Sequence, residues 1–350
     1  MVFAMPVKSS GHYILDKAAL SATLGAQTGT LEMNIYDPRY QNEDAAREHL
    51  EALMWPHGPV CPHCGSLNAR RLPPQKGRKT KAHPEGVVRK GVCQCNDCRQ
   101  QFTVTVGTVF ESSKVPLHKW LLAIHLLVSS KKGISAHQLH RMLGVTYKTA
   151  WFMAHRIREA MVDTDNSPMG GPGGTVEVDE TYLGRDKTKP KSRTPIQHMN
   201  RIVSLVDRVS GRSTSVVFTE SFGPANVSKL LFTRIDRASR LVTDEAGAYI
   251  APGRHFAAHE TVNHRTKEYA RGDVTTNTVE GFFGIFKRGM RGIYQHCGQN
   301  HLHRYLAEFD FRYSNRSGLG VDDAERADLA LKGSAGKRLT YRRIGGLAAA

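Results

Sequence analysis

The chain has 350 residues, of which 40% are hydrophobic and 23% are charged. This length and apolar content favour two or three packed units over one small domain. Lys and Arg total 49 against 32 Asp and Glu, and the net charge of +17 favours a polyanionic partner. The sequence has no signal peptide, lipidation motif or membrane-length apolar run, so we expect a cytoplasmic protein with no membrane partner.

The N-terminal part of the sequence combines a featureless stretch with a cysteine-rich one. Residues 1–41 show no clear periodicity and are expected to be a loose N-terminal tail. A short helix is predicted over 42–54, at the start of a segment that extends over 42–110. Five of the six cysteines fall between Cys61 and Cys98 in this segment. In a large basic chain without a secretion signal, such clustering favours metal binding over disulfides.

Two C-x-x-C pairs define the predicted metal site. Tetrahedral zinc takes four thiolates, and each C-x-x-C turn offers two of them on one side of the metal. The predicted ligands of a structural Zn²⁺ are Cys61, Cys64, Cys95 and Cys98. Cys93 is expected to be a bystander. The 30 residues between the two pairs are densely basic, and their flanking and internal cations are Arg70, Arg71, Lys76, Arg78, Lys79, Lys81, Arg89 and Lys90. We therefore predict a zinc ribbon over 42–110.

Helical patterning follows, and its signals predict a helix-turn-helix over 111–165. Ser135 can cap one helix, Gly144 suits a turn, and Thr146 can cap a second helix to about Met161. The start of such a second helix can enter the major groove of DNA. The candidate DNA contacts on its outer face are Tyr147, Lys148, Thr149 and Arg156. An ordinary helical pair with a solvated basic face would have the same pattern.

The Pro- and Gly-rich run over 166–174 predicts a linker, and strand patterns begin after it. The expected strands are 175–183, 201–207, 213–219, 240–244 and 255–262, and the expected helices are 225–236, 276–290 and 299–313. This order is typical of a ribonuclease H-like fold, which we predict over 175–317. The predicted fold class is therefore α/β, with a ribonuclease H-like catalytic domain preceded by a zinc ribbon and a helix-turn-helix. Residues 318–350 are expected to be a basic C-terminal tail.

Three carboxylates are the candidate catalytic residues of this domain. Asp179 lies in the first strand, Asp244 ends the fourth strand, and Glu280 follows Asp244 after 35 intervening residues, in the next helix. Mg²⁺ or Mn²⁺ selects carboxylate oxygens, and a pair of such ions can break and join phosphodiesters. We take these acids as the ligands of a magnesium pair. Lys287, two helical turns after Glu280, and Arg288 are then candidate DNA contacts.

Alternatives remain open at the residue level. Each of the three acids has a plainer interpretation, as a polar strand residue, a turn former or the helix partner of Lys287. The competitors for the role of metal ligand are Glu177, Glu180, Glu245 and Asn277. His264 can line the site, but a purely structural role is the favoured interpretation of this histidine.

Taken together, the motifs resemble the zinc-ribbon insertion-sequence transposases of the ISXO-like type, from about residue 55 to residue 316. The stretches that carry the resemblance are 55–66 (WPHGPVCPHCGS), 95–102 (CNDCRQQF), 107–110 (GTVF), 178–182 (VDETY), 276–282 (TNTVEGF), 287–289 (KRG) and 304–313 (RYLAEFDFRY). The combination is highly specific, whereas any one of these stretches alone is not.

The resemblance implies a DDE-type DNA transposase whose metal ligands are Asp179, Asp244 and Glu280. It also implies a homo-oligomer that acts on element ends and target DNA. Some relatives use Asn as the third ligand, which keeps Asn277 open, but an anionic oxygen binds magnesium better and Lys287 follows Glu280 at the family's usual offset. The alternatives are a DNA-binding regulator with an inactive catalytic domain and a structure-selective DNA nuclease.

Overall fold

The computed structural model describes residues 35–77, 79, 81, 84–190, 194–268 and 270–340. Of the loose tail predicted over residues 1–41, residues 1–34 lie outside the described residues. Its last residues are folded, contrary to the prediction, because the short helix α1 (Pro38–Gln41) buries Tyr40. Of the helices within the described ranges, none is both long enough and apolar enough to cross a lipid bilayer.

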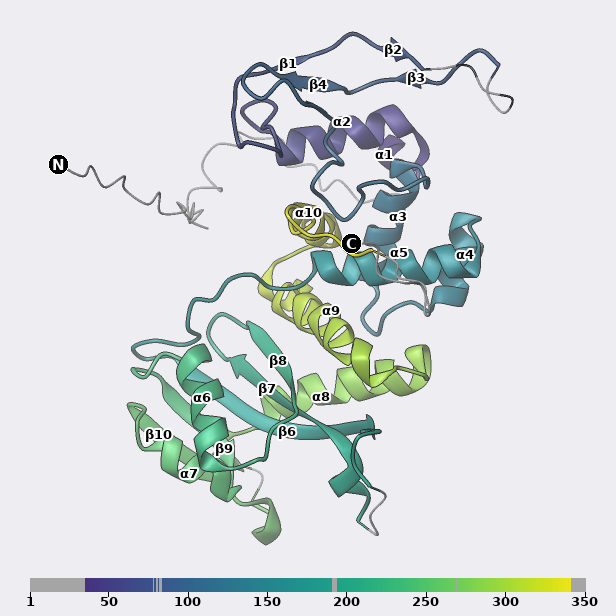
Figure 1. Cartoon of the computed structure of the whole chain (residues 1–350). Helices are drawn as coiled ribbons and strands as arrows, with labels where there is room; N and C mark the ends of the chain where they lie inside the picture. The colour runs from purple at the N-terminus through teal and green to yellow at the C-terminus, as the bar shows by residue number, and fades with distance from the viewer. Residues whose placement is uncertain are drawn as a thin grey trace, which may run out of the picture. The chain divides into compact units, whose positions relative to one another are not determined.

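The cysteine-rich segment folds as one helix followed by short strands. The helix α2 (Glu43–Met54) begins after Asn42, whose side chain accepts hydrogen bonds from the first-turn N–H groups. The strands β1 (Ala69–Arg71), β4 (Cys93–Cys95) and β5 (Gln101–Phe102) form an antiparallel sheet in the order β1-β4-β5. The strands β2 (Gln75–Lys76) and β3 (Val88–Arg89) pair with each other and continue β1 and β4 outward (Figure 1).

Three helices follow, and their ends are where the sequence signals put them. They are α3 (Leu117–Ser129), α4 (Ala136–Leu143) and α5 (Tyr147–Ala160). The hydroxyl of Ser135 accepts a hydrogen bond from the first turn of α4, and the hydroxyl of Thr146 does the same for α5. Gly144 ends α4 in the left-handed conformation, at φ 61°. The predicted caps and turn are thus confirmed.

A five-stranded sheet forms the centre of the C-terminal half. Its strands are β6 (Thr175–Arg185), β7 (Met199–Asp207), β8 (Ser213–Phe218), β9 (Arg240–Asp244) and β10 (Ala258–Val262). The spatial order is β10-β9-β6-β7-β8, with β6, β7 and β8 antiparallel and β9 and β10 parallel to β6. The five strands predicted from the sequence are all present.

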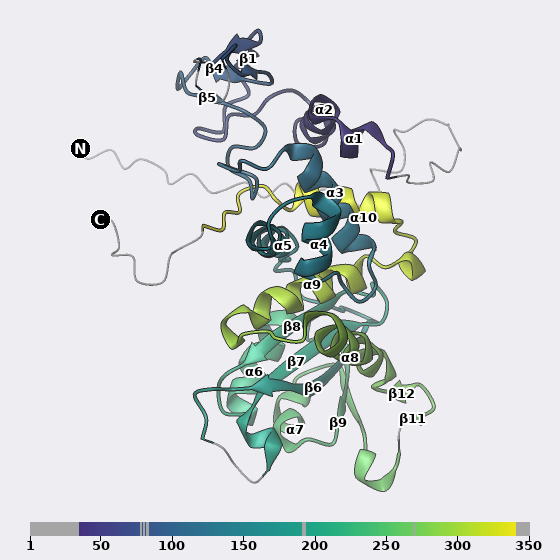
Figure 2. The ribbon, with the colours of Figure 1, turned by 90° about the vertical axis from the view of Figure 1, so that its right-hand side faces the viewer.

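Helices cover both faces of this sheet (Figure 2). On one face, Val176 and Val178 of β6 pack with α6 (Pro224–Arg234) and α7 (Gly247–Gly253). The opposite face packs against α8 (Asn277–Gly289) and α9 (Leu302–Ser314) in a core rich in phenylalanine. Because strand side chains alternate between faces, Glu177 and Asp179 point to the side of α8 and α9.

The expected C-terminal tail is partly helical, which corrects the prediction for residues 318–350. The helix α10 (Asp323–Lys332) is capped by the side chain of Asp322 and contacts α3 and α2. Its inward face is made of small and aliphatic side chains that are buried, including Ala327, Ala330 and Leu331. These few apolar positions give a weak periodic signal, so the sequence alone favoured a tail.

A buried ion-pair network joins α5 to α9. The carboxylate of Glu308 is 0% exposed and accepts hydrogen bonds from Arg158 Nε at 2.6 Å, Arg312 at 2.5 Å and the hydroxyl of Tyr294 at 2.5 Å. Arg312 also donates to the carbonyl of Leu127 at the end of α3. The network therefore connects the helical region to the domain built on the sheet.

Candidate active site and zinc centre

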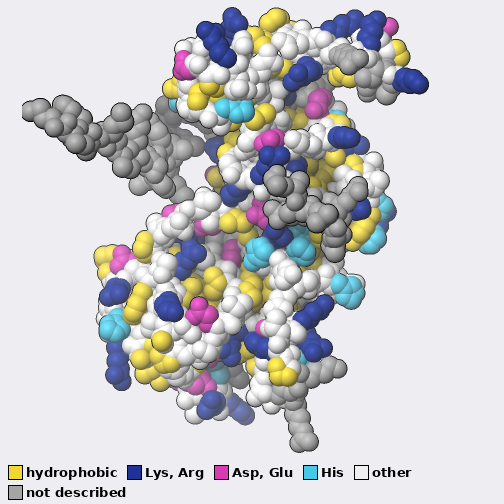
Figure 3. Space-filling view, in the orientation of Figure 1, with side chains coloured by type: hydrophobic (Ala, Val, Ile, Leu, Met, Phe, Trp, Pro, Cys, Tyr) yellow, Lys and Arg dark blue, Asp and Glu magenta, His cyan; other side chains and the backbone are white. Residues whose placement is uncertain are grey.

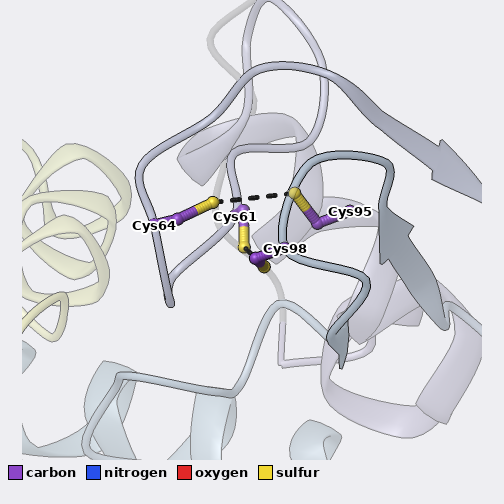
Figure 4. A group of neighbouring side chains, drawn as sticks. All are labelled: Cys61, Cys64, Cys95 and Cys98. Atoms are coloured by element: carbon purple, nitrogen blue, oxygen red, sulfur yellow. Dashed lines mark hydrogen bonds between the residues drawn. The ribbon is translucent and has the colours of Figure 1, made fainter.

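The four predicted zinc ligands converge. Their sulfur atoms all lie within 4.8 Å of one another, with 3.6 Å from Cys61 to Cys98 and 3.6 Å from Cys64 to Cys95. Figure 4 shows the four side chains pointing to a common centre from two segments of the chain. Thiolates at about 2.3 Å from a tetrahedral zinc ion are about 3.8 Å apart, so the residues present fit Zn²⁺.

The two knuckles have matching backbones. The residue after the second cysteine is left-handed in both, with φ 75° at Gly65 and φ 63° at Arg99. Cys93 lies outside the group of four, as predicted, and its buried thiol has a raised pKa because burial disfavours the thiolate. Cys93 is a core residue of the ribbon.

We expect the purified protein to contain zinc and the Cys64→Ser variant to lose it. The substitution leaves three thiolates where the site requires four, and zinc binding contributes on the order of 10 kcal/mol to folding in small zinc domains. Metal content by mass spectrometry and thermal unfolding check this. The control is Cys93→Ala, which should keep its zinc; equal zinc loss in both variants would contradict the assignment.

Three of the four residues predicted to contact DNA lie at the N-terminal end of α5. Tyr147 and Lys148 are exposed and Thr149 is half-buried. The ring of Tyr147 stacks on His137 of α4, with 4.2 Å between ring centroids. Aromatic and cationic side chains thus share the solvent-facing start of this helix.

Arg156 does not lie on that face, and its prediction as an outer-face residue is wrong. Its side chain is 7% exposed and donates hydrogen bonds to the carbonyls of Leu339 and Glu111. Arg156 is nine positions after Tyr147, and at 100° per residue this spacing turns it to the opposite side of the helix. The spacing of Arg156 from Tyr147 along the helix could have predicted this position from the sequence.

Strand register brings two of the three predicted acids together. The last paired residues of β6 and β9 are Val178 and Thr243, so Asp179 and Asp244 come next on adjacent parallel strands. Asp244 ends β9 and accepts a hydrogen bond from the N–H of Ala246, which turns the chain toward α7. One carboxylate oxygen from each of Asp179, Asp244 and Glu180 lies within 4.8 Å of the other two.

Burial and mutual repulsion make this cluster favour a cation. Burial, followed by the charge of Asp244, raises the pKa of Asp179 to about 8. Burial also raises the pKa of Asp244 and of Glu180. Hard oxygen ligands that converge and repel one another are suited to a divalent cation such as Mg²⁺.

Glu180 is a cluster member that the sequence offered only as a competitor. It lies on the face of β6 opposite Asp179, and its carboxylate accepts a hydrogen bond of 2.8 Å from the hydroxyl of Tyr249 in α7. The signal for it was its adjacency to Asp179. Alternation along β6 would place Glu180 on the other face from Asp179. Its carboxylate joins the acidic cluster because it lies close to Asp244 at the end of β9.

Glu280 lies outside this group of three but close to it. Its exposed carboxylate accepts a hydrogen bond of 2.8 Å from Thr276 and lies 3.5 Å from Nε2 of His264. Its charge contributes to the raised pKa of Asp179, so the two acids interact. His264, which the sequence treated as a structural histidine, is thus a neighbour of the third acid.

A buried carboxylate positions the helix that carries Glu280. Glu177 is 0% exposed and accepts hydrogen bonds of 2.9 Å from the N–H groups of Thr278 and Val279, in the first turn of α8. Arg208 balances its charge with an ion pair of 2.6 Å. Since Glu177 is two residues from Asp179 on the same face of β6, it sets the distance from α8 to that acid. It is a positioning residue rather than a competing ligand.

The two predicted cations of α8 differ in their surroundings. Lys287 is half-buried, and burial with the charge of Arg291 lowers its pKa while the charge of Asp179 opposes this. Lys287 therefore lies within electrostatic reach of the acidic cluster. Arg288 is exposed.

Sequence comparison matches two family models to the chain. An ISXO2-like transposase domain covers residues 172–314, and a transposase zinc-ribbon domain covers residues 41–101. Together these models span more than half of the chain. The protein is a metal-dependent DNA transposase of the DDE type, whose cofactors are a divalent cation such as Mg²⁺ and a structural Zn²⁺.

The chain belongs to the zinc-ribbon insertion-sequence transposases with an ISXO2-like domain. It is similar to an uncharacterised protein in transposable element ISH50 of Halobacterium salinarum, with 27% identity, over 78% of this chain and 91% of that protein. A solved chain from a simian T-cell lymphotropic virus intasome in complex with PP2A regulatory subunit B56 gamma matches 49% of this chain at 18% identity and a TM-score of 0.27. That match covers 63% of the viral chain.

Proposed function

We propose that Asp179, Asp244 and Glu280 hold the metal pair with which this transposase cleaves element ends and joins them to target DNA. The observation that carries the proposal is the convergence of the Asp179 and Asp244 carboxylates within 4.8 Å at the end of β9. Two divalent ions bound there would activate the attacking hydroxyl and stabilise the leaving oxygen. Lys287 and Arg288 would then contact a DNA phosphate beside the acids.

Glu280 is preferred as the third ligand because, among the candidate anions, it is the exposed one. Glu177 is buried and binds α8 and Arg208. Glu180 is bonded to Tyr249, and Glu245 accepts a hydrogen bond from the backbone of His264. Asn277 is exposed in the first turn of α8 and offers a neutral oxygen. Glu280 accepts a hydrogen bond from Thr276 but is the exposed anion of the set, and its charge contributes to the raised pKa of Asp179.

We further propose that residues 175–317 form a ribonuclease H-like domain and that α4 and α5 form a DNA-reading helix-turn-helix. Three antiparallel strands followed by two parallel ones, with helices on both faces, support the first assignment. The capped helices and the exposed Tyr147 and Lys148 support the second. Since cleavage and joining involve two element ends, we expect a homo-oligomer on DNA.

The test separates the third-ligand candidates by single substitutions. Wild type should nick and join end-containing DNA only with Mg²⁺ or Mn²⁺. Glu280→Gln should lower cleavage by about a hundredfold or more, since it replaces an anionic metal ligand, whereas Glu180→Gln and Asn277→Ala should stay within about tenfold of wild type. The assay is single-turnover cleavage of a labelled element end.

The same assay tests the function as a whole. A protein that binds ends but never cuts them would be a regulator, and one that cuts without joining would be a nuclease. A larger loss in Glu180→Gln than in Glu280→Gln would move the third ligand to Glu180.

A further inference from the structure

The zinc ribbon carries an extended two-stranded arm that neither the catalytic site nor the helix-turn-helix uses. One side of it runs through β1 and β2, and the other returns through β3 and β4 (Figure 1). Between these paired segments the two sides stay in contact, since the N–H of Leu72 donates to the carbonyl of Val92 at 2.8 Å. We call residues 69–77, 79, 81 and 86–95 the basic arm.

The outer end of the basic arm is closely packed backbone. The N–H of Gly77 donates to the carbonyl of Val87 at 2.8 Å. Gly86 is left-handed, at φ +77°, and a Cβ atom there would meet the carbonyl oxygen of Gly77 at 2.5 Å. Glycine at this position therefore allows the two sides of the arm to approach each other, and the arm is a narrow ribbon.

The charge of this segment is far above that of the chain. Residues 69–95 contain eight Lys and Arg and one acid, a net charge of +7 in 27 residues, against +17 for all 350. Some of these cations have partners, because Arg71 pairs with Glu51 and Lys90 with Asp44. The exposed cations that form no ion pair with a described carboxylate are Arg70, Lys76, Lys79, Lys81 and Arg89, and of these Arg70 donates a hydrogen bond to the side chain of Gln94.

Exposed valines interrupt these cations. Val87 and Val88 are each 51% exposed, at the outer end of the arm. Figure 3 shows Lys and Arg side chains gathered over the ribbon region, with hydrophobic ones between them. Cations beside exposed apolar side chains on a two-stranded ribbon fit a groove of duplex DNA, where cations meet phosphates and an apolar side chain can meet a thymine methyl group.

We propose that the basic arm is a separate DNA-binding element, which lies along a groove of duplex DNA and is held at its base by the zinc site. The inference rests on the proposed function only in that the substrate is DNA. Lys76, Lys79, Lys81 and Arg89 neutralise backbone phosphates, and Val88, which is paired with Lys76 and shares its face of the ribbon, faces base edges. Zinc contributes to this binding because Cys64 and Cys95 fix the two ends of the arm.

The test is the salt dependence of DNA binding by the full-length protein. The variant carries Lys76→Gln, Lys79→Gln, Lys81→Gln and Arg89→Gln. Its matched control carries four exposed or half-buried cations of the α6–α7 region as Gln: Lys229, Arg234, Arg237 and Arg254. The probe is a duplex of element-end sequence, and Kd is measured by fluorescence anisotropy from 50 to 300 mM salt.

Each phosphate contact contributes roughly 0.9 to the slope of log Kd against log salt. The arm variant should therefore lose about 2 to 4 from the slope and about a hundredfold in affinity near 150 mM salt, while the control variant should lose less than about 1 in slope. A charge-conserving variant, with Lys76→Arg, Lys79→Arg, Lys81→Arg and Arg89→Lys, should bind DNA as wild type does. Zinc content must match wild type in every variant, and a variant that fails this is replaced by Lys76→Gln with Arg89→Gln.

Equal slope losses in the arm and control variants would overturn the proposal, because the effect would then follow net charge alone. An unchanged slope in the arm variant, or a loss seen with single-stranded RNA and not with duplex DNA, would also overturn it. The proposed function is tested independently, since a wild type that binds with the full slope but never cuts would leave the arm in place and remove the catalysis.

Discussion

Asp179→Asn is expected to reduce metal-dependent cleavage and joining by at least about a thousandfold, with DNA binding unchanged. The substitution keeps the shape of the side chain and removes the carboxyl group whose pKa is raised by Asp244, Glu180 and Glu280. A neutral amide binds magnesium weakly, so the geometry needed for in-line attack is lost. Single-turnover cleavage of a labelled element end, at saturating protein, measures the effect.

The matched control for Asp179→Asn is Glu220→Gln, which neutralises an exposed acid after β8. It should cleave as wild type does. Binding is followed in the absence of a divalent cation, so that loss of affinity is not mistaken for loss of chemistry. If Asp179→Asn kept more than about a tenth of wild-type cleavage, Asp179 would not be a metal ligand.

Glu308→Gln is expected to lower the free energy of unfolding by about 3 to 5 kcal/mol. The substitution leaves the guanidinium groups of Arg158 and Arg312 buried without a compensating anion. Burial alone would raise the pKa of Glu308, but the charges of these arginines lower it below its ordinary value. The stabilisation is therefore fully present at neutral pH and is lost as the pH falls through the lowered pKa. Urea unfolding at pH 7 measures it.

The control for Glu308→Gln is Glu260→Gln, because Glu260 forms an ion pair with Arg240 that is partly exposed to solvent. Solvent screens such a pair, and we expect a loss of at most about 1 kcal/mol. Equal losses in the two variants would mean that the buried network does not stabilise the junction of α5 and α9.

The sequence was most informative where chemistry and spacing coincide. The four zinc ligands followed from two C-x-x-C pairs, and the caps of α4 and α5 followed from Ser135, Gly144 and Thr146. The strands that carry Asp179 and Asp244 were also predictable, because short β-branched runs favour strands. Their convergence depends on the parallel register of β6 and β9, which no local pattern encodes.

The residues that the sequence placed wrongly or overlooked also owe their positions to contacts between distant parts of the chain. Arg156 was placed on the outer face by its charge, although helical geometry turns it toward residues 339 and 111, and its contacts come from distant parts of the chain. The side chain of Glu180 joins the cluster through the end of β9 rather than through its own strand. The role of Glu177 depends on meeting the start of α8, 101 residues later in the sequence.

Because Glu177 holds the first turn of α8, the position of Glu280 relative to Asp179 does not depend on the length of the chain between Asp244 and Glu280. Two strand residues span about 6.6 Å, so the strand fixes the distance between Glu177, which binds α8, and Asp179. The 35 residues that connect Asp244 to Glu280 therefore do not have to measure this distance. Insertions at an exposed turn of that connection, such as residues 271–273, would leave the third acid in place, because such a turn lies outside α7 and β10.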